Sequence, residues 1–288
     1  GFRSVVFSDL IQFFVMCLSV FLVIAFSAYE FGGLNFLKTN LDPSYFSLTG
    51  SSSISETLVW GLIALSTLVD PNFYQRCFAV KNKATAKWGI VISIGIWVCF
   101  DLCTTFGAMY AKAIIPNADS SSAYLNYAVQ LLPSGMRGFV LAGILATIIS
   151  TLDSYLFLAG TSLSYDLAPK KWRGRVSNHY ISIILVGLVS IIFASYFKGN
   201  IKTVWKTLGS YSSACLLFPV VFAYFFPKRI GDKAFVTASL SSAFCVTVWR
   251  SIELKGFLAN VDELYIGLLC SATILMLSII KKNKTSAS

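Results

Sequence analysis

The feature that most constrains this chain is a succession of apolar runs of about twenty residues, separated by short polar connections. An α-helix of that length rises about 1.5 Å per residue and so spans the roughly 30 Å hydrocarbon layer of a membrane. Hydrophobic residues fill 56% of the 288 positions and charged residues only 12%, against about 25% charged residues in soluble domains. This composition excludes a soluble globule and predicts an all-α membrane protein, with residues 1–288 in a single transmembrane domain.

Hydropathy predicts about eight transmembrane helices, an even number that places both ends of the chain on the same side of the membrane. Most of the 23 basic residues fall in segments that are cytoplasmic if the N-terminal end is cytoplasmic, so the positive-inside rule favours this orientation. We therefore expect a multi-pass protein of a plasma (inner) membrane, with the lipid bilayer and not nucleic acid as its partner. The predicted helices lie near residues 5–28, 57–78, 88–115, 138–165, 178–197, 203–226, 234–252 and 262–281.

The sequence shows no pattern typical of a catalytic or cofactor site. The seven cysteines lie in or at the ends of apolar runs without a CxxC pair, so we expect neither structural disulfides nor zinc. The only histidine, His179, has no acidic residue within a helical turn. We predict no catalytic residues, no cofactor and no enzyme activity.

Three acidic residues fall within predicted membrane helices: Asp9, Asp101 and Asp153. A charge at the bilayer centre costs about 3 kcal/mol or more on insertion scales, so each of these acids is a candidate functional residue. Asp9 lies only one turn inside its helix, where a carboxylate also reaches interfacial water. Asp101 lies deeper and either faces a solute or pairs with another residue.

A polar strip on the fourth predicted helix surrounds Asp153. Ser150, Asp153 and Ser154 share one helical face, and Thr147 and Thr151 line the adjoining one. Hydroxyl, carboxylate and carbonyl oxygens are the ligands that a small hard cation such as sodium prefers. The alternative is that the hydroxyls bond back to their own helix while Asp153 bonds to a neighbouring helix.

The second predicted helix is interrupted by the pair Asp70 and Pro71. Proline removes a helix hydrogen bond and disfavours helical geometry in the residue before it. Broken helices at membrane depth line cavities and build the binding sites of secondary transporters. The alternative is an ordinary helix that ends at a cytoplasmic cap.

Four segments in the same order resemble the sodium:solute symporter family: SVVFSDLIQ at 4–12, DPNFYQR at 70–76, LATIISTLDS at 145–154 and LGSY at 208–211. The resemblance implies a LeuT-type core of two inverted five-helix repeats. The first predicted helix is similar to the last helix of repeat one, helices two to six resemble repeat two, and the last two are peripheral. The first four core helices are missing, so the resemblance implies a C-terminal fragment of a transporter.

The same resemblance implies two sodium positions, with Na⁺ as the coupling ion and the only metal. The common position uses the hydroxyls of Ser150 and Thr151 and the main-chain carbonyl of Thr147. Its remaining ligands belong to the missing first core helix. A possible second position uses Asp9, Ser150, Asp153 and Ser154.

For the solute, the resemblance points to three regions of the core. Because Ile63 is apolar where sugar carriers tend to be polar, an amino acid, a carboxylate or a similar small metabolite is expected rather than a sugar. The implied function is sodium-coupled symport by alternating access, and the alternative is a symporter-like sensory input module of a signalling protein. The candidate solute-binding residues are Ile63, Ser66, Thr67, Trp97, Asp101, Tyr211 and Ser212.

Overall fold

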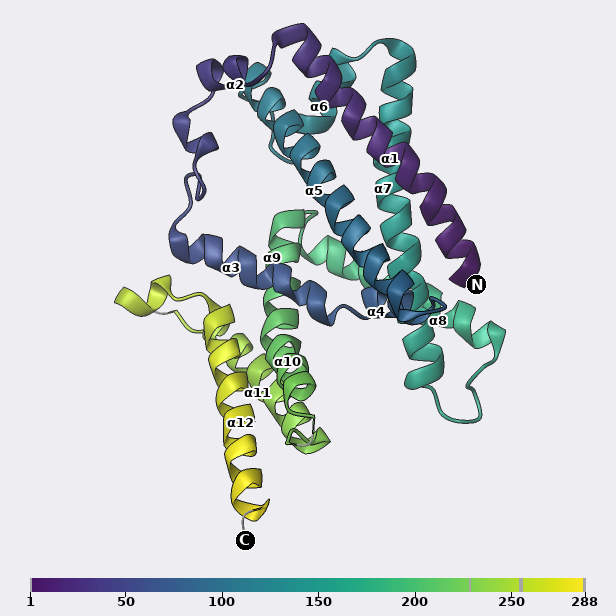
Figure 1. The fold of residues 1–288 in the computed structure, drawn as a ribbon, viewed down its shortest axis with the longest axis vertical. Helices are drawn as coiled ribbons and strands as arrows, with labels where there is room; N and C mark the ends of the chain where they lie inside the picture. Colours follow the sequence, from purple (N-terminus) through teal and green to yellow (C-terminus); the bar gives the residue numbers. More distant parts are fainter. Residues whose placement is uncertain (1, 228, 254–255, 287–288) are drawn as a thin grey trace. The chain divides into compact units, whose positions relative to one another are not determined.

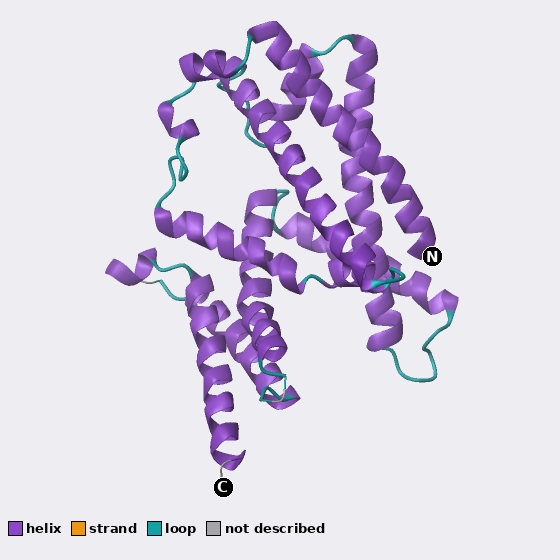
Figure 2. Cartoon of the chain, viewed as in Figure 1, coloured by secondary structure: helices purple, strands orange, loops and turns teal. Residues whose placement is uncertain are grey.

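The computed structural model describes residues 2–227, 229–253 and 256–286, and every regular element in these ranges is a helix (Figures 1 and 2). Residues 1, 228, 254, 255, 287 and 288 of the predicted domain lie outside the described ranges. The chain forms two compact units. The first comprises Gly1–Gly50 and Tyr74–Ser190, and the second comprises Ser51–Phe73 and Ile191–Ser288.

The first unit is built around the helix pair α1 and α7, with α5 packed against α1 (Figure 1). Two short helices, α2 and α6, join this group, and α8 follows α7 in the chain. The elements of this unit, two of which cross its boundary, are α1 (Phe2–Phe31), α2 (Leu34–Asn40), η1 (Pro43–Phe46), α4 (Pro71–Phe78), α5 (Lys83–Ile114), α6 (Ala123–Leu131), α7 (Ser134–Thr161), η3 (Ser162–Asp166) and α8 (Val176–Tyr196).

The contact between α1 and α7 is close because a glycine faces a serine. A side chain at Gly143 of α7 would overlap the side chain of Ser19, and its Cβ would lie 3.3 Å from the carbonyl oxygen of Val15. The Ser19 hydroxyl lies 2.6 Å from that same oxygen and 3.3 Å from the carbonyl oxygen of Phe139 on α7. Small residues let membrane helices approach in this way, since lipid supplies little hydrophobic force between them.

The hydrophobic core of the first unit lies where α1, α2, α5 and α6 meet. Val23, Leu37, Tyr110 and Leu132 are among its buried members, together with Tyr127 of α6. The Tyr127 hydroxyl donates a 2.7 Å hydrogen bond to the Ser27 hydroxyl, so its polar end is satisfied inside the core.

The second unit packs around the π-helical turn η4, which contacts α9, α10, α11 and α12. Gly209 and Gly267 allow close approach here: a Cβ on Gly209 would lie 2.5 Å from Ile63, and one on Gly267 would lie 2.6 Å from Ala214 and from Val246. The elements are α3 (Ile54–Ala64), η2 (Leu65–Val69), α9 (Ile201–Ser212), η4 (Ser213–Leu217), α10 (Phe218–Phe225), α11 (Asp232–Ser251), η5 (Gly256–Asn260) and α12 (Glu263–Ser286).

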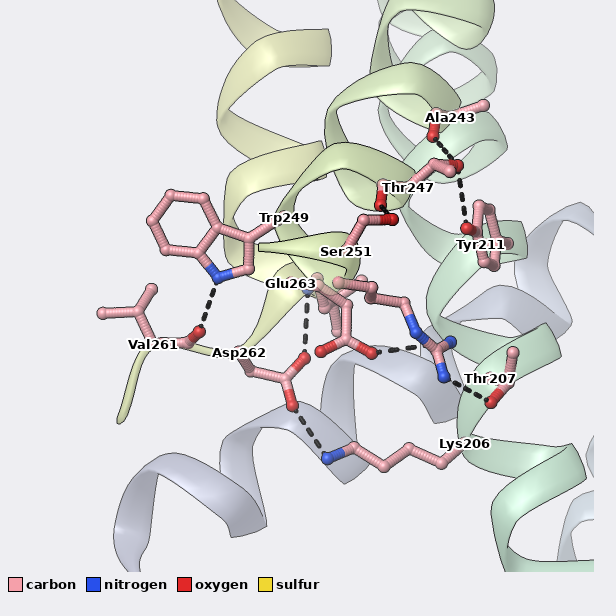
Figure 3. A network of polar contacts seen from close by, with 12 residues as sticks. Lys206, Thr207, Tyr211, Ala243, Thr247, Trp249, Ser251, Val261, Asp262 and Glu263 are labelled. Atoms are coloured by element: carbon pink, nitrogen blue, oxygen red, sulfur yellow. Dashed lines mark hydrogen bonds and ion pairs between the residues drawn. The ribbon is translucent and has the colours of Figure 1, made fainter. Parts of the chain in front are cut away.

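Charged side chains join the middle of α9 to the end of α11 and the start of α12 within the second unit (Figure 3). Lys206 of α9 lies 2.9 Å from the carboxylate of Asp262, just before α12. Arg250 of α11 donates to the Thr207 hydroxyl at 3.2 Å and lies 3.8 Å from Glu263. These contacts tie α9 to the connection between α11 and α12.

Six helical stretches in the described part of the chain are long and apolar enough to cross a membrane. They overlap six of the eight predicted spans. Of the other two, 234–252 forms the continuous helix α11, which does not fall among the six, so the count of eight stays a prediction. The six are Phe2–Phe31, Lys83–Ile114, Ser134–Asp166, Val176–Tyr196, Ile201–Phe225 and Glu263–Lys281.

The remaining predicted span, 57–78, is interrupted. Helix α3 ends at Ala64, a 3-10 turn follows over Leu65–Val69, and Asp70 is extended with ψ 116° before α4 begins at Pro71. The Asp70 carboxylate accepts a 2.8 Å hydrogen bond from the main-chain N–H of Asn72, as a residue at a helix start does. The interruption expected from Pro71 is therefore present, and it begins a turn earlier than the proline itself.

Candidate functional site

A cluster of polar side chains in the first unit joins α1, α4 and α7. Its centre is Asp9 on α1, whose side chain is 18% exposed. The Arg76 guanidinium on α4 lies 2.7 Å from Asp9 Oδ2. Ser150 and Ser154, one turn apart on α7, present their hydroxyls to the same carboxylate. The cluster is assembled from three segments that are distant in the chain.

Each oxygen of the Asp9 carboxylate has its own donors. The Ser150 hydroxyl donates to Oδ1 at 3.0 Å. The Ser154 hydroxyl donates to Oδ2 at 3.2 Å and itself accepts a 2.8 Å hydrogen bond from Nη2 of Arg76. Ser154 is only 5% exposed, whereas the Arg76 side chain is 39% exposed. Of Asp9, Ser154 and Arg76, Arg76 thus has the most solvent-exposed side chain.

Asp153 does not join the cluster, although the sequence analysis grouped it with Asp9, Ser150 and Ser154. Its side chain forms no hydrogen bond or ion pair with any residue that the structure describes. Of the four predicted ligands of the second sodium position, the structure brings together Asp9, Ser150 and Ser154.

Thr147 and Thr151, predicted for the common sodium position, are exposed on α7 in the described chain. The Thr151 hydroxyl donates to the Thr147 carbonyl oxygen at 3.0 Å, and the Thr147 hydroxyl donates to the Gly143 carbonyl at 2.9 Å. Two predicted ligand oxygens are therefore adjacent. Both threonine hydroxyls back-bond to their own helix, as the alternative interpretation expected, whereas the Ser150 hydroxyl turns to Asp9.

The predicted solute residues of the second unit differ in burial. Ile63 is 2% exposed and packs against α9, so its side chain contacts protein. Tyr211 is half-buried, and its hydroxyl lies 2.8 Å from that of Thr247 on α11. Ser66 and Ser212 are half-buried and Thr67 is exposed.

The other two predicted solute residues, Trp97 and Asp101, lie on α5 in the first unit. Trp97 is 69% exposed, and the Asp101 side chain is exposed as well. The predicted solute residues therefore fall in two separate compact units, and their assignment to one site stays a prediction.

Arg76 is the residue of the cluster that the sequence analysis missed. By its charge and position alone, it is one of the basic residues that favour the predicted orientation. The weak signal was its place at the end of DPNFYQR, just after the interrupted span, but 67 positions separate it from Asp9 and nothing in the sequence pairs the two.

The first unit thus holds an oxygen-rich polar cluster on long apolar helices, an arrangement that belongs to an integral membrane protein. A sequence model of the Sodium:solute symporter family matches residues 1–239, and the chain belongs to this family.

Among its relatives, the chain is 24% identical to the sodium/pantothenate symporter of Haemophilus influenzae over 93% of its length and 59% of that protein. It is 23% identical to the high-affinity proline transporter PutP of Bacillus subtilis, over 90% of the chain and 57% of the transporter. It is also 23% identical to the mouse sodium/myo-inositol cotransporter 2, over 81% of the chain and 42% of the cotransporter. The chain spans less than two thirds of the length of these proteins.

Family membership and the six apolar helices make this an integral, multi-pass membrane protein. The relatives carry the names of transporters, which agrees with the prediction that the chain is not an enzyme. The family assignment from the four sequence motifs is confirmed.

Proposed function

We propose that the full-length protein containing this chain is a secondary active transporter that couples sodium to the uptake of a small organic solute. The observation that carries the proposal is the Asp9, Ser150 and Ser154 cluster between α1 and α7, in a chain that belongs to a symporter family. A carboxylate within an apolar helix is rare and marks a candidate ion or proton site. The relatives' names give no support to the alternative of a sensory module.

The common sodium position in this proposal consists of the Ser150 and Thr151 hydroxyls and the Thr147 carbonyl. The adjacency of the Thr151 hydroxyl and the Thr147 carbonyl oxygen supports it, since one ion can contact both. The exposed face of α7 at Thr147 and Thr151 leaves room for further ligands from elsewhere in the full-length protein.

Transport by alternating access within a LeuT-type core completes the proposal. The interrupted second span supports this architecture because broken helices in such transporters line the solute path. Coupling requires only that sodium and solute each bind one conformation better, and this preference is reciprocal. One charge moving down a membrane potential supplies about 2.3 kcal/mol per 100 mV.

We propose an amino acid, a carboxylate or a similar small metabolite as the solute. The apolar side chain of Ile63 at a predicted solute position supports this choice over a sugar, because it offers no hydrogen bond to a hydroxyl group. The named relatives include carriers of pantothenate and of proline, which fit these classes, and of myo-inositol, which does not.

The test is uptake by the full-length protein in proteoliposomes with an inward sodium gradient. The solute panel contains amino acids, carboxylates and other small metabolites. Wild type should accumulate at least one solute only when sodium is present, and a Ser150→Ala/Thr151→Ala variant should lose this sodium dependence. The matched control is Ser190→Ala/Ser195→Ala on α8, which removes two hydroxyls that bond only back to their own helix. Sodium-dependent uptake that survives the first double substitution would exclude the assigned ion position.

A further inference from the structure

The cluster around Asp9 already contains a cation, and that cation belongs to the protein. We propose that Arg76 and a sodium ion are alternative occupants of Asp9, so that the guanidinium must leave before sodium binds at the second position. This inference rests on the proposed function and concerns its second ion. It makes Arg76 a residue that controls when that position is available.

The first argument is geometric. Nη2 of Arg76 lies 2.7 Å from Asp9 Oδ2 and 2.8 Å from Ser154 Oγ. These oxygens are two of the ligands predicted for the second sodium ion. A sodium ion bound to both would lie where the guanidinium nitrogen now lies, and it would need the lone pairs that accept the N–H bonds. The two occupants exclude each other.

The second argument is electrostatic. Asp9 is the only carboxylate in the cluster, since Asp153 forms no ion pair among the described residues. One negative charge that is only 18% exposed compensates one cation well and two poorly. When the guanidinium leaves, Asp9 becomes an unpaired and largely buried charge, and sodium is the replacement that restores neutrality.

The third argument concerns the path of exchange. The Arg76 side chain is 39% exposed, so its charged end has water beside it and a long flexible stem on which to retract. Arg76 also belongs to the last turns of α4, the short helix that restarts after the interrupted span. Docking of Arg76 therefore adds a tie between this helix and α1 and α7, and sodium binding at Asp9 removes that tie and loosens the helix.

The experiment titrates sodium into purified full-length protein and follows the rise of Tm, because an ion that binds only the folded state stabilises it. Choline replaces sodium so that ionic strength stays constant. A tethered cation competes at an effective concentration in the millimolar range, so Arg76→Gln should lower the sodium concentration at half-effect about tenfold. Arg76→Lys, which keeps the charge, should remain near wild type.

Two further variants assign the effect to Asp9. In an Asp9→Asn background, Arg76→Gln should cause no further change, because the shared carboxylate is gone. The matched control is Lys81→Gln, which removes an exposed positive charge nearby and should leave the titration unchanged. The same variants are then titrated with Thr151→Ala added to each. This substitution weakens the common sodium position, so the rise of Tm reports mainly the second position.

A measurement without substitution at the cluster checks the release of α4. Cys77 follows Arg76 and is half-buried. Its alkylation in the wild-type protein, read by peptide mass spectrometry, should become faster as sodium rises through the range that shifts Tm. An unchanged rate would contradict the release of α4.

The inference is overturned if Arg76→Gln leaves the sodium titration unchanged, or if its effect persists without the Asp9 carboxylate. These outcomes are distinct from failure of the proposed function, which would appear as wild-type protein that takes up no solute on a sodium gradient. Binding of sodium to Asp9 is measured here by stability and does not depend on transport.

Discussion

At the scale of single residues, Tyr127 shows how a polar group is accommodated in the core of the first unit. Its side chain is 1% exposed, its hydroxyl donates to Ser27, and the Ser27 hydroxyl in turn donates to the Val23 carbonyl at 2.7 Å. The chain of bonds links α6 to α1 and ends on a main-chain oxygen. Burial raises the pKa of Tyr127 to about 12, because a phenolate would lose its hydration.

Removing this hydroxyl should destabilise the protein modestly. Tyr127→Phe keeps the ring and loses one hydrogen bond, which costs about 1 kcal/mol of unfolding free energy. Tyr180→Phe is the control, since Tyr180 is 64% exposed. Thermal unfolding in detergent compares the two. Equal Tm values for both variants would show that the Tyr127 to Ser27 bond contributes nothing.

The raised pKa also predicts a pH dependence. The folded protein keeps the Tyr127 proton above pH 10, where an exposed tyrosine loses it. The stability that the protonated, buried Tyr127 contributes is therefore complete below pH 10 and is lost as pH rises toward about 12. Wild type should lose stability over this range more steeply than Tyr127→Phe. Parallel pH profiles of Tm for the two proteins would contradict the assignment.

At the scale of helices, the contact between α1 and α7 positions the polar cluster. Gly143→Ala should force the two helices apart, because the new methyl group overlaps Ser19, and overpacking of this kind costs about 1–3 kcal/mol. Sodium binding should weaken as well, since the same pair of helices holds Asp9 beside Ser150. Tm and the sodium titration measure the two effects.

The same helix supplies the control for Gly143→Ala. A Cβ at Gly138 would meet nothing within 4 Å, so Gly138→Ala should leave both measurements unchanged. Adding Ser19→Gly to Gly143→Ala removes the overlapping side chain and should restore part of the lost stability. A Gly143→Ala protein with wild-type Tm would mean that the helices tolerate separation.

Long apolar runs allowed six of the helices to be predicted from the sequence. The pairing of side chains from different segments could not be predicted, because it depends on tertiary contacts. The interruption after the second span was visible because Pro71 acts locally. The pairing of Asp9 with Arg76 was not, since it depends on how three segments meet. Asp153 shares a helical face with Ser150 and Ser154 in the sequence, yet only the two serines contact Asp9. Spacing along one helix does not say which partner lies opposite.

In the second unit, the ion pair between Lys206 and Asp262 joins the middle of α9 to the start of α12. Asp262 also accepts a 3.0 Å hydrogen bond from the Leu264 N–H at the start of α12. Asp262→Asn keeps that acceptor and removes the charge. Because Lys206 is 41% exposed, the loss should stay below about 1 kcal/mol and vanish at high salt. Asp232→Asn, at an exposed position on α11, is the control for Tm.

At the scale of the whole molecule, the orientation in the membrane remains a prediction from the distribution of basic residues. It can be tested with two single cysteines in exposed loops, Ser121→Cys and Lys171→Cys. A membrane-impermeant maleimide should label position 121 in intact cells and position 171 only after permeabilisation, as read by peptide mass spectrometry. The reverse pattern would invert the topology.

The interrupted span also has a consequence for how the protein is made. Helix α3 has 11 residues, about half of what a bilayer requires, and the turn at Leu65–Val69 leaves main-chain groups that an unbroken helix would satisfy. During biosynthesis this segment enters the membrane at a disadvantage and depends on later helices to shield it. Substitutions that complete the helix should therefore raise the yield of inserted protein while removing the polar backbone that the proposed solute path uses. Under the proposed function, selection for yield and selection for transport would act on this segment in opposite directions.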